Sequence, residues 1–263
     1  MTDTRQRFRV LHRKGCFVMP NPHDLGSTRL LAQLGFPALA TTSGGFAASV
    51  GRADMTIDRD AVVAHVGAVA AATSLPVNAD SERCFADTPA GVADTVRLLA
   101  EAGAAGCSIE DWDPETRAID PLPVSVERVR AAVGAASESG IVLTARCESI
   151  LRGVHGLDET IERLLAFKEA GAEVLYAPGL TDLEGIRRLV AEVGAPVNVL
   201  LMPGGPGVGD LAGAGVRRIS TGSRLASVAY GSLVAAATSL LEQGQIDAGL
   251  PALDRDLAKR AFV

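Results

Sequence analysis

Four carboxylate residues, Asp80, Glu82, Glu110 and Glu148, each lie at or just after the end of a short apolar run in the sequence. Acids brought together at one edge of a fold would repel one another unless a cation lies among them. Oxygen ligands without histidine or thiolate favour Mg²⁺ or Mn²⁺. Arg146 precedes Glu148 by two positions, and its planar guanidinium suits a substrate carboxylate. These residue types predict a metal site that also binds a small anion.

The segment TTSGG, which contains Ser43, Gly44 and Gly45, is a second feature suited to anion binding. The two glycines have no Cβ, so consecutive backbone N–H groups can approach a bound oxyanion closely. Asn198 lies in another apolar run and adds a polar group. Asp54, in VGRADMTI, fits either a partner of metal-bound water or a turn residue. Together these residues predict a small anionic substrate held by metal, arginine and backbone amides.

Short strand-like runs that alternate with helical patterns must position these residues. The expected strands are residues 16–20, 38–42, 76–80, 106–111, 142–146, 174–178, 197–202 and 217–222. Between them, apolar residues recur at three- and four-residue spacing, as in LDETIERLLAFKEAG, which is typical of helices with one buried face. Eight such units predict a single-domain α/β protein, a (β/α)₈ TIM barrel, whose active site lies at the carboxyl ends of the strands.

The domain is expected to span residues 1–263, with the barrel over about 15–243 and a short C-terminal helical extension over 244–263. A doubly wound open sheet is the alternative fold, although it usually has fewer strands and a G-x-G-x-x-G turn after the first.

Composition excludes several classes of protein. A net charge of -6 and a pI near 5.3 argue against nucleic-acid binding, which needs clustered Lys and Arg. The four cysteines show no CxxC spacing, which argues against structural zinc. The polar N-terminus lacks the apolar stretch of a signal peptide, and the apolar segment LASVAYGSLVAAATSLL is interrupted and short for a membrane span. We therefore expect a cytoplasmic protein with no nucleic-acid or membrane partner.

Seven motifs follow one another along the chain: NPHDLGSTRLLAQLGFPALATTSGGFAASVG, VNADSE, SIED, TARCE, EAGAEVLYAPG, PVNVLL and GVRRISTGS. In type and order they closely resemble the isocitrate lyase/phosphoenolpyruvate mutase superfamily over about residues 15–240. The resemblance is greatest to its short members: phosphonomutases, phosphonopyruvate hydrolases, oxaloacetate decarboxylases and 2-methylisocitrate lyase-like proteins. It implies a Mg²⁺-dependent barrel, with Mn²⁺ as the other possible metal. It also implies a homodimer or homotetramer that exchanges the last barrel helix between subunits.

The same resemblance implies roles for individual residues. Asp80 would be the principal metal carboxylate, and four other acids would act mainly through metal-bound waters: Asp54, Glu82, Glu110 and Glu148. Arg146 would grip the substrate carboxylate. The predicted substrate-binding residues are Ser43, Gly44, Gly45, Arg146 and Asn198. The predicted catalytic residues are Ser43, Asp54 and Arg146.

Two departures from the superfamily narrow the predicted chemistry. The long lyases carry a Lys-Lys/Arg-Cys-Gly-His segment whose cysteine is a general acid/base, whereas this chain has IEDWDPETRAIDPLP. In the loop after the third strand, Cys84 and Ala86 replace glycines of the relatives. We therefore expect a lyase or hydrolase that acts on a small 2-oxo acid or dicarboxylate through an enolate-like species, most specifically an oxaloacetate decarboxylase. The alternatives are phosphonomutase or phosphonopyruvate hydrolase chemistry and a metabolite-binding barrel without turnover.

Overall fold

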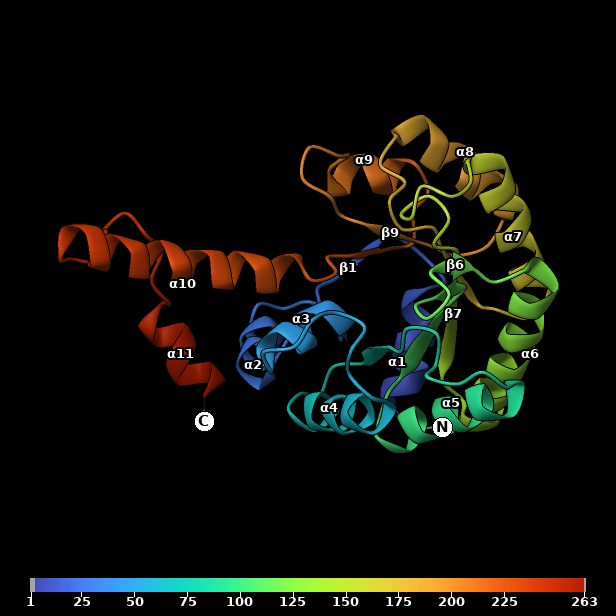
Figure 1. The fold of residues 1–263 in the computed structure, drawn as a ribbon, viewed down its shortest axis with the longest axis horizontal. Helices are drawn as coiled ribbons and strands as arrows, with labels where there is room; N and C mark the ends of the chain where they lie inside the picture. The colour runs from blue at the N-terminus through green and yellow to red at the C-terminus, as the bar shows by residue number, and fades with distance from the viewer. Residues whose placement is uncertain (1–2, 263) are drawn as a thin grey trace.

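Eight parallel strands form one sheet that curls into a nearly closed barrel in the computed structural model, which describes residues 3–262 (Figure 1). The strands are β1 Phe17–Met19, β2 Leu39–Ala40, β3 Val77–Asp80, β4 Gly106–Glu110, β7 Val142–Arg146, β8 Val174–Tyr176, β9 Val197–Leu200 and β10 Arg218–Ser220. Their order is β1-β10-β9-β8-β7-β4-β3-β2. The amide of Ala40 donates to the carbonyl oxygen of Pro20 at 3.1 Å and links the two outer strands. The predicted barrel is confirmed, and the doubly wound alternative is wrong.

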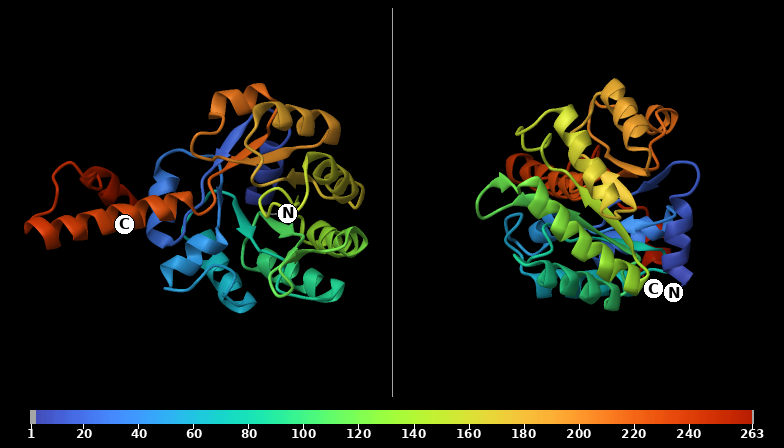
Figure 2. Two further views of the ribbon diagram at one scale, coloured as in Figure 1. Left: turned by 45° about the horizontal axis from the view of Figure 1, so that its top comes forward. Right: turned by 90° about the vertical axis from the view of Figure 1, so that its right-hand side faces the viewer.

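The helices lie outside the strands and follow them along the chain (Figures 1 and 2). They are α1 Asp3–Leu11, α2 Leu25–Gln33, α3 Ser43–Ser49, α4 Arg59–Ala71, α5 Pro89–Glu101, α6 Leu122–Ser139, α7 Leu157–Glu169, α8 Leu183–Val193, α9 Val208–Gly213, α10 Arg224–Gln243 and α11 Arg255–Ala261. In α7 the predicted apolar stripe is buried through Ile161, Leu164 and Phe167. Burial of such stripes against the strands supplies most of the stability of these helices.

Two elements were not expected from the sequence. Helix α1 places Phe8, which is fully buried, against Phe17 of β1 at the amino-terminal end of the barrel. The loop after β4 forms an antiparallel hairpin from β5, Trp112–Asp113, and β6, Ala118–Ile119. Residues 109–123, which contain this hairpin, include no cysteine or histidine. The guanidinium carbon of Arg152 lies 4.4 Å from the ring centroid of Trp112, which anchors the hairpin to the loop after β7.

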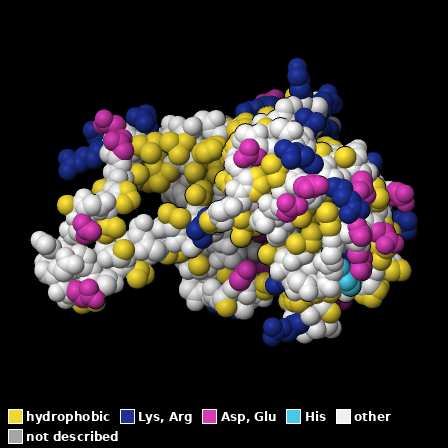
Figure 3. All heavy atoms as spheres, turned by 90° about the horizontal axis from the view of Figure 1, so that it is seen from above, with side chains coloured by type: hydrophobic (Ala, Val, Ile, Leu, Met, Phe, Trp, Pro, Cys, Tyr) yellow, Lys and Arg dark blue, Asp and Glu magenta, His cyan; other side chains and the backbone are white. Residues whose placement is uncertain are grey.

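Helix α10 leaves the barrel and forms an arm with α11, which turns back toward α2 (Figures 1 and 2). Several of its large apolar side chains are exposed, including Leu233 at 64% and Leu241 at 87%. Figure 3 shows hydrophobic side chains along this arm. The sequence of this helix was expected to be too short for a membrane span. The helix has 20 residues, however, and by length and composition it could cross a membrane. A single such helix is weak evidence for a membrane, because a helix that packs against another protein has the same composition.

Candidate active site

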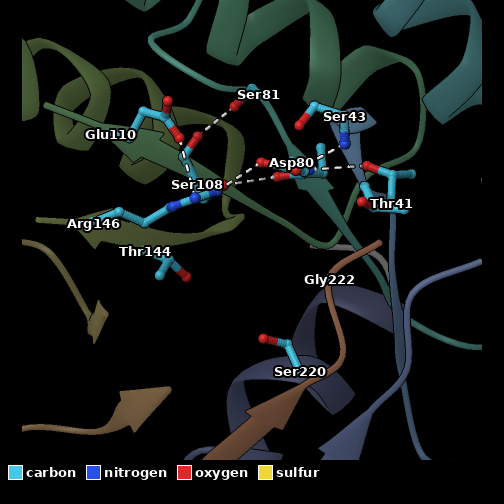
Figure 4. A network of polar contacts seen from close by, with 12 residues as sticks. Thr41, Ser43, Asp80, Ser81, Ser108, Glu110, Thr144, Arg146, Ser220 and Gly222 are labelled. Atoms are coloured by element: carbon cyan, nitrogen blue, oxygen red, sulfur yellow. Dashed lines mark hydrogen bonds and ion pairs between the residues drawn. The ribbon is translucent and has the colours of Figure 1, made fainter. Parts of the chain in front are cut away.

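Arg146, the last residue of β7, holds together carboxylates from three neighbouring strand ends (Figure 4). Its Nη1 donates to Asp80 Oδ1 at 2.9 Å, and its Nε and Nη2 donate to Glu148 Oε1 at 3.0 and 2.7 Å. Nη2 also lies 3.2 Å from Glu110 Oε2. Burial alone would lower the pKa of Arg146, but the charges of these acids raise that pKa well above its usual value. The guanidinium is therefore charged near neutral pH.

Asp80 ends β3 and connects this cluster to the TTSGG segment. Its Oδ2 accepts the backbone N–H of Ser43 at 2.9 Å, and its own N–H donates to Thr41 Oγ1 at 2.9 Å. Both carboxylate oxygens are thus held in place, one by a guanidinium and one by the first amide of α3. Such support keeps the side chain pointing into the barrel mouth, which is what a metal-binding carboxylate requires.

Glu82 is buried close to Asp80 and has an unusual environment. Its backbone φ is 45°, in the left-handed region, and its Oε1 has no hydrogen-bond partner among the residues that the structure describes. Burial, with smaller contributions from the charges of Asp80 and Asp54, raises the pKa of Glu82 to about 8. Burial likewise raises the pKa of Glu110 well above its usual range. Burial therefore makes two of the predicted metal acids bind a proton more readily than an exposed carboxylate does.

Glu82→Gln is expected to make the free energy of unfolding less dependent on pH in the presence of EDTA. Because the folded-state pKa of about 8 exceeds the usual 4.5, wild type loses stability as pH rises from 4.5 to 8. The variant removes that loss, so at pH 9 it should be more stable than wild type by on the order of a few kcal/mol. Urea unfolding at pH 4.5 and 9 measures this, with Glu101→Gln on the surface of α5 as control. Parallel pH profiles for all three proteins would contradict the expectation.

The loop after β3 carries strain at two neighbouring positions, Cys84 and Phe85, beyond Glu82. Cys84 has φ of 61° and Phe85 has φ of 51°, conformations that favour glycine. Cys84 is fully buried, and burial raises the pKa of its thiol to about 12. The thiol therefore stays protonated and packs in the core, as expected for a divergent loop residue rather than a nucleophile.

The start of α3 needs both of its glycines for close approach to neighbouring side chains. A Cβ on Gly44 would lie 3.0 Å from Asp54 Oδ2, and one on Gly45 would lie 2.5 Å from Thr42 Cγ2. Thr42 caps the helix by accepting the N–H of Gly45 at 3.4 Å. Asp54 is exposed and stands beside the first turn of α3, in reach of the barrel mouth.

A cavity of about 410 Å³ at the carboxyl ends of the strands brings together most of the predicted residues. Six of them line it: Ser43, Gly44, Asp54, Asp80, Arg146 and Asn198. The remaining four lie behind this wall: Gly45, Glu82, Glu110 and Glu148. Asn198 is at the wall, but its Oδ1 accepts from Arg218 at 2.8 Å and its Nδ2 donates to Ser220 Oγ at 2.9 Å. Its amide is therefore already paired within the protein.

A layer of polar side chains that the sequence motifs did not predict lies at the floor of this cavity. It includes Ser108 on β4, Thr144 on β7, Tyr176 on β8 and Arg218 on β10, all buried inside the barrel. The signal available in the sequence was the alternation of polar and apolar residues within RRISTG and GCSIED, where the polar positions face inward.

The carboxylates fit a divalent cation that has one direct protein ligand. Among residues 3–262 no three His, Cys, Asp or Glu side chains form a ready-made metal site, because the Arg146 guanidinium lies between the acids. Asp80 alone of the four predicted metal acids lines the cavity. Glu82 Oε1 and Glu148 Oε2 are buried acceptors without a hydrogen bond in the described chain, and metal-bound waters are donors that would satisfy them. The donor set is all oxygen, as Mg²⁺ or Mn²⁺ prefers.

Comparison with known proteins gives consistent matches. The family model described as phosphoenolpyruvate phosphomutase matches residues 8–241. The 2-methylisocitrate lyase of Escherichia coli is 36% identical over 178 residues, which are 64% of this chain and 60% of that enzyme. An uncharacterized protein of Mycobacterium tuberculosis is 32% identical over 247 residues, covering 93% of this chain and 92% of its own. A structure described as a candidate lyase/mutase of Burkholderia cenocepacia has a TM-score of 0.92 and 46% identity, covering 98% of this chain and 94% of that one.

Proposed function

Because this chain belongs to the phosphoenolpyruvate phosphomutase family, in the superfamily of lyases and mutases that act on small oxo acids, we propose that it is a Mg²⁺-dependent lyase acting on a 2-oxo dicarboxylate. The most specific form of the proposal is decarboxylation of oxaloacetate. The observation that carries it is the pairing of Asp80 with Arg146 and the Ser43 amide at one cavity wall. The β5–β6 hairpin supports it, because it brings no cysteine or histidine to the mouth.

The binding roles follow from the donors and acceptors at the cavity. Asp80 would hold the metal, with Glu82, Glu110, Glu148 and Asp54 accepting from its waters. When bound, Mg²⁺ or Mn²⁺ supplies positive charge that offsets negative charge on the substrate's keto oxygen. In the first turn of α3 the amides of Ser43 and Gly45 already donate to Asp80 and Thr42, and the Gly44 amide at the cavity wall would donate to the substrate with no reorganisation.

Arg146 has N–H capacity left for a substrate. A guanidinium has five N–H groups, and three of those on Arg146 donate to carboxylates: Nε and one on Nη2 to Glu148, and one on Nη1 to Asp80. Nη2 also forms an ion pair with Glu110 Oε2 at 3.2 Å. The remaining Nη1 hydrogen would donate to the substrate carboxylate from the cavity wall. The carboxylates that fix the guanidinium keep it oriented, so binding costs little side-chain entropy.

Decarboxylation suits a site without a strong general acid. The bond between the departing carboxylate carbon and C3 breaks, carbon dioxide leaves, and the electron pair passes to the enolate of pyruvate. Water then protonates C3. Carbon–carbon cleavage that releases a larger carbon fragment would require a positioned acid, and the described cavity wall has no cysteine or histidine.

Pyruvate release from oxaloacetate tests the proposal. The purified protein with Mg²⁺ should decarboxylate oxaloacetate faster than the same concentration of Mg²⁺ alone, and EDTA should abolish the difference. Coupled assay of pyruvate with lactate dehydrogenase measures the rate. Phosphate release from phosphonopyruvate would instead identify phosphonate chemistry. Tight oxalate binding with no turnover of either compound would identify a metabolite-binding barrel, which the strained Cys84 and Phe85 loop would then explain.

We also propose a cytoplasmic homo-oligomer in which α10 packs on a second copy of the chain. The exposed apolar side chains of α10, such as Leu233 and Leu241, support this, because the helix leaves the barrel and nothing in the described chain covers them (Figures 1 and 3). With α10 uncovered, the chain exposes more contiguous apolar surface than a monomeric protein usually does. Light scattering would give the mass of a dimer or tetramer; a monomer mass would contradict the proposal.

A further inference from the structure

Arg218 crosses the interior of the barrel below the cavity. It belongs to β10, is 2% exposed, and binds three neutral partners on three different elements. Its Nε donates to Asn198 Oδ1 at 2.8 Å and its Nη2 to Thr144 Oγ1 at 2.9 Å. Its Nη1 lies 3.3 Å from His12 Nε2, which accepts because His12 Nδ1 faces the Phe8 carbonyl oxygen at 2.8 Å.

No carboxylate within the described chain lies within 4 Å of Arg218, which sets it apart from the other buried arginines. Arg163 is 2.9 Å from Asp111, and Arg128 is 3.6 Å from Asp120. An unpaired buried charge is costly, so its retention calls for a compensating anion or a strong structural role. Burial, with a smaller contribution from the nearby charge of Arg146, lowers the pKa of Arg218 to about 9.

Arg218 also lines the cavity that contains Asp80 and Arg146. Its guanidinium has five N–H groups, and its three partners use three of them, which leaves two. Figure 4 shows Thr144 and Ser220 below Arg146 and Asp80. Thr144 Oγ1 accepts a hydrogen bond from Arg218. Three arginines therefore line the cavity: Arg146, Arg218 and, at its rim, Arg224 in the first turn of α10. Three carboxylates compensate Arg146, whereas Arg218, inside the barrel, has no carboxylate within 4 Å among the described residues.

We propose that Arg218 is a specificity-determining residue that selects substrates with a second carboxylate, which enters the barrel below Arg146 and pairs with the free N–H groups of Arg218. The inference rests on the proposed function, because the first carboxylate and the keto group are taken to bind at Asp80, Ser43 and Arg146. It deepens that function by naming the residue that recognises the second carboxylate of a dicarboxylate substrate. A monocarboxylate would leave the Arg218 charge buried without a counterion.

Matched ligands test the proposal on the metal-loaded protein. Malate and 2-hydroxybutyrate share a four-carbon chain and differ at the distal carbon, which is a carboxylate in one and a methyl group in the other. With Mg²⁺ present, calorimetry should show that wild type binds malate at least about tenfold more tightly, as expected for hydrogen bonds to a charged group. Arg218→Met should lose most of this preference. Arg218→Lys, which keeps the charge, should retain part of it.

Arg217→Met is the matched control, because Arg217 precedes Arg218 and donates to the exposed Gly15 carbonyl oxygen at 2.7 Å. This variant should keep the wild-type preference. Oxalate reports on the site at Asp80 and should bind to all four proteins. Equal preference for malate in wild type and Arg218→Met, with oxalate binding intact, would overturn the role of Arg218 alone. Failure of wild type to bind oxalate with Mg²⁺ would overturn the proposed function and this inference with it.

Discussion

Asp80→Ala is expected to lower kcat/KM for oxaloacetate by about 10³-fold, equivalent to about 4 kcal/mol of transition-state stabilisation. Asp80 is the one predicted metal acid at the cavity wall, and its two oxygens also orient Arg146 and the first amide of α3. Removing it takes away the direct metal ligand and both of these orienting contacts. Steady-state pyruvate release at saturating Mg²⁺ measures the effect.

Asp94→Ala is the matched control, because Asp94 is exposed on α5 and pairs only with Arg97, three residues away on the same helix, at 3.0 Å. This variant should retain wild-type activity, since exposed ion pairs contribute little. The Mg²⁺ dependence of oxalate binding should disappear in Asp80→Ala and persist in Asp94→Ala. Unchanged Mg²⁺-dependent turnover in Asp80→Ala would refute the assignment of Asp80 as the metal carboxylate.

Arg146→Met is expected to produce the largest loss of stability, about 3–5 kcal/mol at pH 8.5, because it leaves three carboxylates buried without their counterion. At pH 5 the loss should be smaller. A buried carboxyl whose folded-state pKa is raised, such as Glu110, is stable while protonated and loses stability as pH rises through that pKa. Without the guanidinium the pKa of Glu110 rises further, so the penalty grows with pH. Urea unfolding in EDTA at both pH values measures it.

Arg188→Met provides the comparison for an exposed arginine. Arg188 on α8 is 2.7 Å from Asp158 and 2.6 Å from Glu192, yet its side chain is 48% exposed. Solvent screening makes such pairs worth about 0–1 kcal/mol, so little change is expected at either pH. An equal loss for Arg146→Met at pH 5 and 8.5 would show that packing of the side chain, rather than its charge, accounts for the effect.

The sequence predicted the barrel because its signals are repeated: eight buried runs, each followed by a helix, leave few alternative folds. It also predicted that Asp80, Glu110 and Arg146 would meet, since parallel strands end at the same rim. The barrel shows why Arg218 was missed. A three-residue strand is too short to reveal which of RRIS points inward, and that direction depends on the register with β9 and β1.

Elements whose signals are local and weak were also missed. The hairpin at Trp112 has only two residues in each strand, and contact with Arg152 from a distant loop helps to hold it. The sequence of α1 shows no apolar stripe that would predict a helix, because Phe8 is its one buried residue. In both cases tertiary contacts, rather than local propensity, determine the structure.

The arm formed by α10 makes the shape of the substrate cavity sensitive to events far from it. Arg224 and Ser227, in the first turns of α10, line the cavity, whereas the other end of this 20-residue helix is about 30 Å away. A continuous helix is stiff, and α10 begins two residues after Gly222, whose φ of 52° lies in the left-handed region. A contact that shifts the distant end of α10 would therefore also shift Arg224. If a second copy makes that contact, dilution of the protein should lower its activity per molecule.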